Sequence, residues 1–282
     1  MIMYKSILSI FLIVFNFQFV LGNDFPFEYE KTGSGKQTII FVPGFACSGE
    51  IWKDTKSKFE NQYTVYTLTM SGFAGVKPKE NISFKYWEKG IADFIISSQI
   101  DRPIIVGHSM GGSLALAIAA DFPKLIGGAV VVDALPCLSA LMNPSFKSAI
   151  NIDCSAIIKQ MTDLNDNQFT EMQQNTLRYM ASDTILVNKL VAWSVTSDRR
   201  TFGEMYCDFS NTDLRDALKN IQCPVLILLE PQFQSLKSQI DDQYKKLSKA
   251  NIKFANKGFH FIMIDDKDWF LKELADFLIM HH

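Results

Sequence analysis

The feature that most constrains the fold is a serine at position 109, between an apolar run and a segment rich in small residues. Residues 103–106 have the sequence Pro-Ile-Ile-Val, which is typical of a short buried strand. Residues 113–122 are rich in Ala and Leu and precede a proline, which predicts a helix. Gly107 and Gly111 flank the serine, at positions where a Cβ would collide with a tightly turned backbone. The stretch matches the G-x-S-x-G nucleophile elbow, which exposes a serine hydroxyl.

The rest of the chain alternates short apolar runs with segments of helical spacing. Strands are expected over residues 25–30, 37–42, 63–70, 103–106, 128–132, 224–229 and 252–254. Helices are expected over residues 84–99, with Ser83 as N-cap, 113–122, 236–247 and 268–278, and Thr212 is expected to cap a further short helix. Apolar strands that alternate with helices predict an α/β fold with a mostly parallel central sheet covered by helices on both faces.

Residues 135–211 break this alternation, because they contain no strand candidate. Helices are expected over residues 156–161, 170–180, 184–194 and 201–206. We therefore expect an inserted all-helical cap over residues 135–211, with the α/β core formed by residues 23–134 and 212–282. Four methionines lie in the helices expected here: Met161, Met172, Met180 and Met205. They suit an adaptable apolar site, although ordinary helix packing is the favoured interpretation.

The first 22 residues differ in kind from the rest of the chain. Lys5 precedes an apolar run over residues 7–20. Gly22 then supplies a small residue that suits a cleavage site. This pattern predicts a signal peptide over residues 1–22 and a secreted or periplasmic protein. An uncleaved anchor is the alternative, but the run is shorter than the ~20 residues that a membrane span needs. No later stretch is long and apolar enough to cross a bilayer, so we expect no integral membrane span after cleavage.

Charge and cysteine content exclude several partners. The 28 basic and 30 acidic residues nearly balance, with no basic field for nucleic acid and no polybasic run for an anionic membrane. The five cysteines are too few for a disulfide scaffold, and no Cys/His spacing suggests a metal site. Cys137 and Cys154 flank one irregular segment and could pair, although buried free thiols explain them equally well.

A nucleophilic serine needs a base, and the chain has only four histidines. His108 lies inside the elbow, where we expect it to point away from the reacting face. His281 and His282 end the chain and are expected to fray. His260 remains as the candidate base, on a loop between the last expected strand and the terminal helix.

The carboxylate that orients the base has two candidates. Asp133 ends the strand over residues 128–132, at the same sheet edge as Ser109, and is favoured. Glu230 ends the next strand and is the alternative acid. Asp265 and Asp266 follow His260 closely and are expected to cap the last helix.

The oxygen of a tetrahedral intermediate needs two donors. The backbone N–H of Met110 follows the nucleophile at a helix N-terminus and supplies one. The loop after residues 37–42 is expected to supply the other, because Gly44 permits a close approach and Phe45 carries an N–H.

Three segments in order resemble the α/β-hydrolase superfamily with a helical cap: residues 42–45 (Val-Pro-Gly-Phe), 107–112 (Gly-His-Ser-Met-Gly-Gly) and 258–260 (Gly-Phe-His). Residues 41–49, 132–136 and 260–263 resemble more narrowly a group of exported bacterial members. The resemblance implies the chain order nucleophile, acid, base. The chain departs from the family in having Pro43 where many members have histidine. It also lacks the usual aspartate after the next-to-last strand, and some lipases of this fold carry the acid one strand earlier, where Asp133 lies.

The residues and the resemblance together predict a serine hydrolase that cleaves carboxylic esters, or related acyl bonds, through an acyl-enzyme. The chemistry requires no metal or organic cofactor, and the near-neutral, aromatic-rich chain favours an uncharged, partly apolar small-molecule substrate. The same residues could serve an aminopeptidase, a lactonase or a C–C bond hydrolase. A non-catalytic binding protein of this fold is the alternative from another class.

Overall fold

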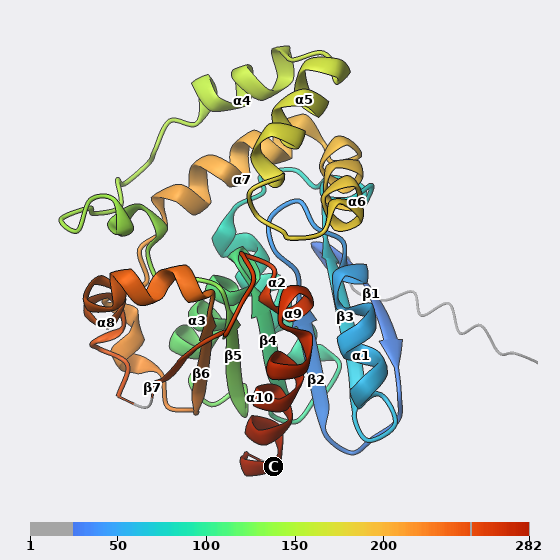
Figure 1. The fold of residues 1–282 in the computed structure, drawn as a ribbon, viewed down its shortest axis with the longest axis vertical. Coiled ribbons are helices and arrows are strands. Elements are labelled where there is room, and N and C mark those ends of the chain that lie inside the picture. The colour runs from blue at the N-terminus through green and yellow to red at the C-terminus, as the bar shows by residue number, and fades with distance from the viewer. Residues whose placement is uncertain (1–24, 249, 282) are drawn as a thin grey trace, which may run out of the picture.

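A seven-stranded sheet forms the centre of the protein, in a computed structural model that describes residues 25–248 and 250–281 (Figure 1). The strand order is β1-β3-β2-β4-β5-β6-β7. The bounds are β1 Phe27–Thr32, β2 Thr38–Val42, β3 Thr64–Met70, β4 Ile104–His108, β5 Gly128–Val132, β6 Val225–Leu229 and β7 Ala250–Phe254. Only β1, at one edge, runs antiparallel to its neighbour. The expected parallel α/β sheet is confirmed, whereas the expected signal peptide lies outside the described residues.

Helices cover both faces of the sheet. Every residue of β4, β5 and β6 is therefore buried, and all of them except His108 are apolar or small. One face packs against α2 (Phe84–Ser97), α3 (Met110–Asp121) and α8 (Lys237–Tyr244). The other packs against α1 (Lys53–Phe59) and α10 (Lys267–Met280). The short α9 (Ile262–Asp265) precedes α10.

Two predictions about helix ends have opposite outcomes. The Ser83 hydroxyl accepts the backbone N–H of Tyr86 at 3.0 Å, so the expected N-cap of α2 is confirmed. Thr212, however, ends a helix instead of starting one: its hydroxyl donates to the Asp208 carbonyl one turn earlier, and the next short helix begins only at Ala217. A threonine hydroxyl can satisfy either a donor or an acceptor, so its position alone does not give the direction of the helix.

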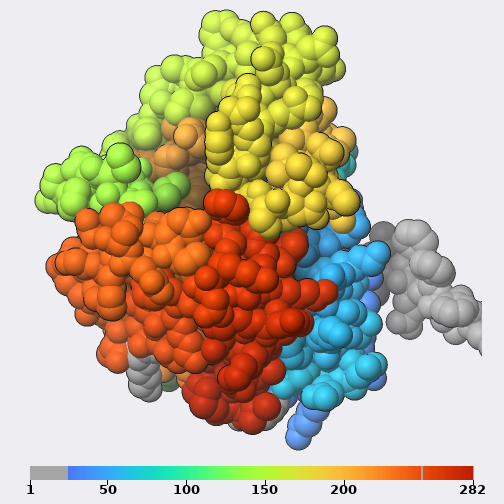
Figure 2. Space-filling view, viewed as in Figure 1, coloured from blue at the N-terminus to red at the C-terminus, as the bar shows by residue number. Residues whose placement is uncertain are grey.

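Four helices lie over the carboxyl ends of the strands (Figure 1): α4 (Ser155–Asp163), α5 (Asp166–Leu177), α6 (Thr184–Val195) and α7 (Arg199–Asn211). They form a layer, here called the cap, that stands on the core as a distinct lobe (Figure 2). A disulfide between Cys154 and Cys207 joins the start of α4 to α7. The Cys137–Cys154 pairing considered from sequence is therefore wrong, and Cys137 is a buried free thiol.

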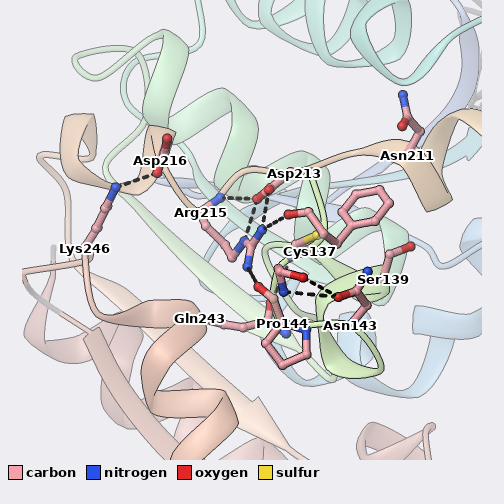
Figure 3. A network of polar contacts seen from close by, with 12 residues as sticks. Cys137, Ser139, Asn143, Pro144, Asn211, Asp213, Arg215, Asp216, Gln243 and Lys246 are labelled. Atoms are coloured by element: carbon pink, nitrogen blue, oxygen red, sulfur yellow. Dashed lines mark hydrogen bonds and ion pairs between the residues drawn. The ribbon is translucent and has the colours of Figure 1, made fainter. Parts of the chain in front are cut away.

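The segments that lead into and out of the cap are tied together by Arg215 (Figure 3). Its guanidinium donates to the Pro144 and Phe146 carbonyls, on the segment that precedes α4, and pairs with Asp213. The Gln243 side chain, on α8 of the core, accepts the backbone N–H of Cys137 at 3.1 Å. Both connections to the cap are thus fixed near the core. In the described residues, no helix is long and apolar enough to cross a membrane.

Candidate active site

Ser109 occupies a sharp turn between β4 and α3. Its backbone is strained, with φ 53° and ψ −123°, and its N–H donates to the Val132 carbonyl at 2.8 Å. The turn requires glycine on both sides: a Cβ on Gly107 would lie 2.0 Å from the Gly111 carbonyl oxygen, and one on Gly111 would lie 2.4 Å from the Val42 carbonyl oxygen. The glycines therefore bring strand and helix close enough to hold Ser109 at their junction.

The carboxyl ends of β4 and β5 place an acidic side chain beside this turn. His108 pairs in register with Val132, so Ser109 and Asp133 both follow their strands at the same level of the sheet. The Asp133 backbone has φ 49°, and its residue is only 3 % exposed. Its Oδ1 accepts the backbone N–H of Glu230 at 2.7 Å, which leaves Oδ2 for a second partner.

That second partner is His260, on the loop between β7 and α9. Its Nδ1 lies 2.6 Å from Asp133 Oδ2. A carboxylate accepts hydrogen bonds, so the contact favours the tautomer with hydrogen on Nδ1 and a basic lone pair on Nε2. The loop is held by the two aspartates that follow it: Asp265 accepts the backbone N–H of Phe259 at 2.9 Å, and Asp266 accepts that of Asn256 at 2.9 Å. Asp266 does stand at the N-cap position of α10, as predicted, but its carboxylate makes no cap bond and holds this loop instead. Asp265 lies in α9 and does not cap the last helix.

Glu230, the alternative acid, reaches Asp133 through its backbone only. No hydrogen bond joins its carboxyl to His260 within the described residues. Burial, and then the negative charge of Asp133, raise the pKa of the Glu230 carboxyl to about 7. The structure thus brings Asp133, and not Glu230, into contact with the imidazole.

His108 lies against His260, contrary to the expectation that it points away. The two rings have centroids 4.6 Å apart, and the His108 Nε2–H donates to the His260 backbone carbonyl at 2.9 Å. Burial, followed by the nearby His260, lowers the pKa of His108 well below its usual value, so this ring is neutral. His108 and Ser109 line the same cavity, and the backbone leaves the strand geometry at Ser109, directly after His108.

A cavity of about 510 Å³ opens between the core and the cap. Ser109 and His260 line its floor from the core, and Met161, Met172 and Met180 line it from the cap. These three methionines both line the cavity and pack in or against the hydrophobic core, so the two interpretations hold together for them, whereas Met205 is fully buried in the core. The lining contains no Asp, Glu, Lys or Arg. Elsewhere in the described chain, no three His, Cys, Asp or Glu side chains gather in a way that could hold a metal ion.

Two backbone N–H groups flank the serine. Met110 is the first residue of α3, directly after Ser109. Phe45 follows Gly44 on the loop after β2, and this loop passes so near that a Cβ on Gly44 would lie 3.2 Å from the Ser109 Cβ. The Phe45 ring packs edge-on against Phe202 of α7, with centroids 4.6 Å apart, and so joins the loop to the cap.

The fold is that of an α/β hydrolase, and the sequence agrees: residues 39–273 match the alpha/beta hydrolase family, to which the chain belongs. Among similar proteins is the pimeloyl-[acyl-carrier protein] methyl ester esterase of Aliivibrio fischeri (strain MJ11), 22% identical over 261 residues, which are 90% of this chain and 98% of the relative.

Two solved structures show the same fold. The enol-lactonase from Burkholderia xenovorans LB400 superposes with a TM-score of 0.73 at 15% identity, covering 90% of this chain and 96% of that one. A thermophilic esterase from Thermogutta terrifontis superposes with a TM-score of 0.74 at 14% identity, covering 91% and 94%. The predicted superfamily and fold class are therefore confirmed.

Proposed function

We propose that this α/β hydrolase is a serine esterase that uses Ser109 as nucleophile, His260 as base and Asp133 as the acid that orients the base. The observation that carries the proposal is the 2.6 Å contact between His260 Nδ1 and Asp133, beside a cavity that Ser109 also lines. A buried carboxylate in this position holds the imidazole in the tautomer that can accept the serine proton.

In the proposed reaction, the Ser109 oxygen attacks the ester carbonyl while His260 Nε2 takes its proton. The N–H groups of Phe45 and Met110 donate to the oxyanion that forms. As the intermediate collapses, the imidazolium returns the proton to the leaving alcohol, and an acyl-enzyme remains. Water then attacks this ester in the same way, with His260 again as base, and releases the acid and the free serine.

An ester or lactone is the substrate class that we favour. The cavity lining has no charged side chain that would hold a charged substrate, and its methionine and leucine side chains suit an acyl or alcohol chain. Similar proteins are described as a methyl ester esterase and an enol-lactonase, which also supports carboxylic ester chemistry.

A fluorophosphonate probe and a p-nitrophenyl ester series test this proposal. We expect the purified protein to label at Ser109 and to hydrolyse the esters, and Ser109→Ala to lose the label and at least ~10⁴-fold in kcat. Equal labelling of both proteins would show that Ser109 is not a nucleophile, and the non-catalytic binder would then be favoured. Faster turnover of lactones, aminoacyl amides or β-diketones than of esters would favour one of the alternative hydrolases.

We also propose that the protein is exported and loses residues 1–22. The Cys154–Cys207 disulfide supports an oxidising compartment. Mass spectrometry of the mature protein in its native host should find the new N-terminus at Asn23, whereas an intact Met1 would contradict cleavage.

A further inference from the structure

Of the polar residues of the cap that line the cavity, Gln173 and Ser194 are the two that are buried. Gln173 of α5 is 6 % exposed, and Ser194 of α6 is 3 % exposed. Both line the cavity. Within the described residues, neither the Gln173 amide nor the Ser194 hydroxyl forms a hydrogen bond with another protein group.

Neighbouring hydroxyls on the same helices show that local partners exist. The Thr176 hydroxyl, which also lines the cavity from α5, donates to the Met172 carbonyl at 3.0 Å. The Thr196 hydroxyl of α6's C-cap likewise donates to the Ala192 carbonyl at 3.1 Å. Gln173 and Ser194 therefore differ from Thr176, because their hydrogen-bonding groups have no protein partner in the described residues and are available to a molecule that occupies the cavity.

Buried polar groups in folded proteins are nearly always paired. An apolar residue at either position would pack against the methionine and leucine lining, whereas the amide and the hydroxyl offer hydrogen bonds to a molecule in the cavity. Both groups can donate and accept, so they suit a neutral partner such as a carboxamide, ester, ketone or hydroxyl. A carboxylate or ammonium group would lack a counter-charge, because no charged side chain lines the cavity.

We propose that the substrate carries an uncharged hydrogen-bonding group at a distance from its scissile ester, and that Gln173, together with Ser194, binds this group in the cap. This inference rests on the proposed esterase function. The core supplies Ser109 and His260 to the cavity, and α5 and α6, which contact each other and lie above the sheet in Figure 1, supply Gln173 and Ser194. The cap thus selects substrates by a polar end, while the core carries out the chemistry.

The test uses p-nitrophenyl esters of increasing acyl length that end in one of three groups of similar shape: carboxamide, isopropyl or carboxylate. For the wild type, the ratio of kcat/KM for the carboxamide to that for the isopropyl ester should rise to a maximum at one chain length, where the amide reaches Gln173. The carboxylate esters should be poorer than the carboxamides at every length. A ratio that does not vary with length would overturn the inference, even if every variant failed to fold.

Gln173→Met removes the amide while keeping the length of the side chain. We expect it to lower the carboxamide-to-isopropyl ratio about tenfold at the favoured chain length, the value of one well-made neutral hydrogen bond. Ser194→Ala should lower the ratio at the same length by a smaller factor. Thr176→Val is the matched control: it removes a cavity hydroxyl that already has a partner, so the ratio should stay at its wild-type value.

The outcomes separate this inference from the proposed function. If Ser109 labels and the isopropyl esters are hydrolysed, but Gln173→Met lowers all esters equally, Gln173 has only a structural role and the inference is wrong. If the ratio falls equally in Thr176→Val, general cavity polarity and not Gln173 is responsible. If no ester is hydrolysed by the wild type, both proposals fail.

Discussion

The Asp133 carboxylate divides its two oxygens between a side chain and the backbone. Oδ2 contacts His260 Nδ1, and Oδ1 accepts the Glu230 N–H. Because the carboxylate is buried and both its oxygens accept, the imidazole must present a hydrogen to it. Orientation and tautomer of His260 therefore depend on the same side chain.

Replacing Asp133 should separate the two candidate acids. In Asp133→Asn the amide oxygen is needed by the Glu230 N–H, so the NH₂ group faces His260 Nδ1 and forces the wrong tautomer. We expect kcat on a p-nitrophenyl ester to fall by about 10⁴-fold. Glu230→Gln retains the backbone N–H and should change kcat by less than about tenfold. Equal losses, or a larger loss for Glu230→Gln, would make Glu230 the acid.

Glu230 should also make stability depend on pH. Its pKa is about 7 in the folded protein and near the ordinary 4.5 when unfolded, so the folded state binds more protons between these values. The free energy of unfolding therefore falls as pH rises through this window. Glu230→Gln removes that term, so urea unfolding at pH 5 and pH 8 should show a greater relative gain for the variant at pH 8. An identical difference at both pH values would show that the pKa of Glu230 is not raised.

At the scale of elements, local sequence patterns predict several strands, one turn and one helix correctly. The strands over β4, β5 and β6 are short apolar runs that only a doubly covered sheet accommodates, and the elbow glycines fix the turn between β4 and α3. Helix α2 was also predictable, because an apolar face and a serine N-cap coincide. Helix α1 was not expected: its polar sequence buries only Thr55 and Phe59, so it has little periodic signal.

Local sequence patterns do not predict contacts between segments that are distant along the chain. Asp265 and Asp266 look like helix caps because they precede α10, yet they hold the His260 loop. The choice between Asp133 and Glu230 likewise depends on which carboxylate the loop approaches across the sheet edge. The Cys154–Cys207 pair forms because α4 packs on α7, which spacing along the chain does not reveal. That the Gln173 side chain lacks a partner and faces the cavity follows only from the three-dimensional structure.

The molecule as a whole consists of an α/β core and a helical cap, joined where the chain enters and leaves the cap. Arg215 lies at this junction, and its guanidinium donates hydrogen bonds to two backbone carbonyls and to the Asp213 carboxylate (Figure 3). A planar guanidinium can reach several acceptors at once, which a lysine ammonium cannot do in the same geometry. Arg215 acts beside two other links between these segments: the Asn211 side chain bonds to the Ala149 backbone, and the Ser139 hydroxyl donates to the Ser210 carbonyl.

Arg215→Leu should loosen this junction. Loss of the guanidinium leaves the Pro144 and Phe146 carbonyls and the Asp213 carboxylate without this partner, and we expect unfolding in urea to require about 1–3 kcal/mol less. Arg215→Lys should fall between the wild type and the leucine variant. Arg200→Leu is the control, because Arg200 forms only an exposed pair with Glu204 and should change stability by less than about 0.5 kcal/mol. Equal effects of Arg200→Leu and Arg215→Leu would refute this role.

The left-handed backbone at Ser109 bears on how chains of this kind diverge. A side chain at φ 53° and ψ −123° carries strain of about 1–3 kcal/mol, which glycine would relieve. Under the proposed chemistry, selection for hydrolysis opposes selection for stability at this one position. A lineage that no longer needed the reaction would gain by exchanging serine for glycine there while keeping the rest of the elbow. Glycine at this position in an otherwise similar sequence would therefore be the mark of a descendant that has abandoned hydrolysis.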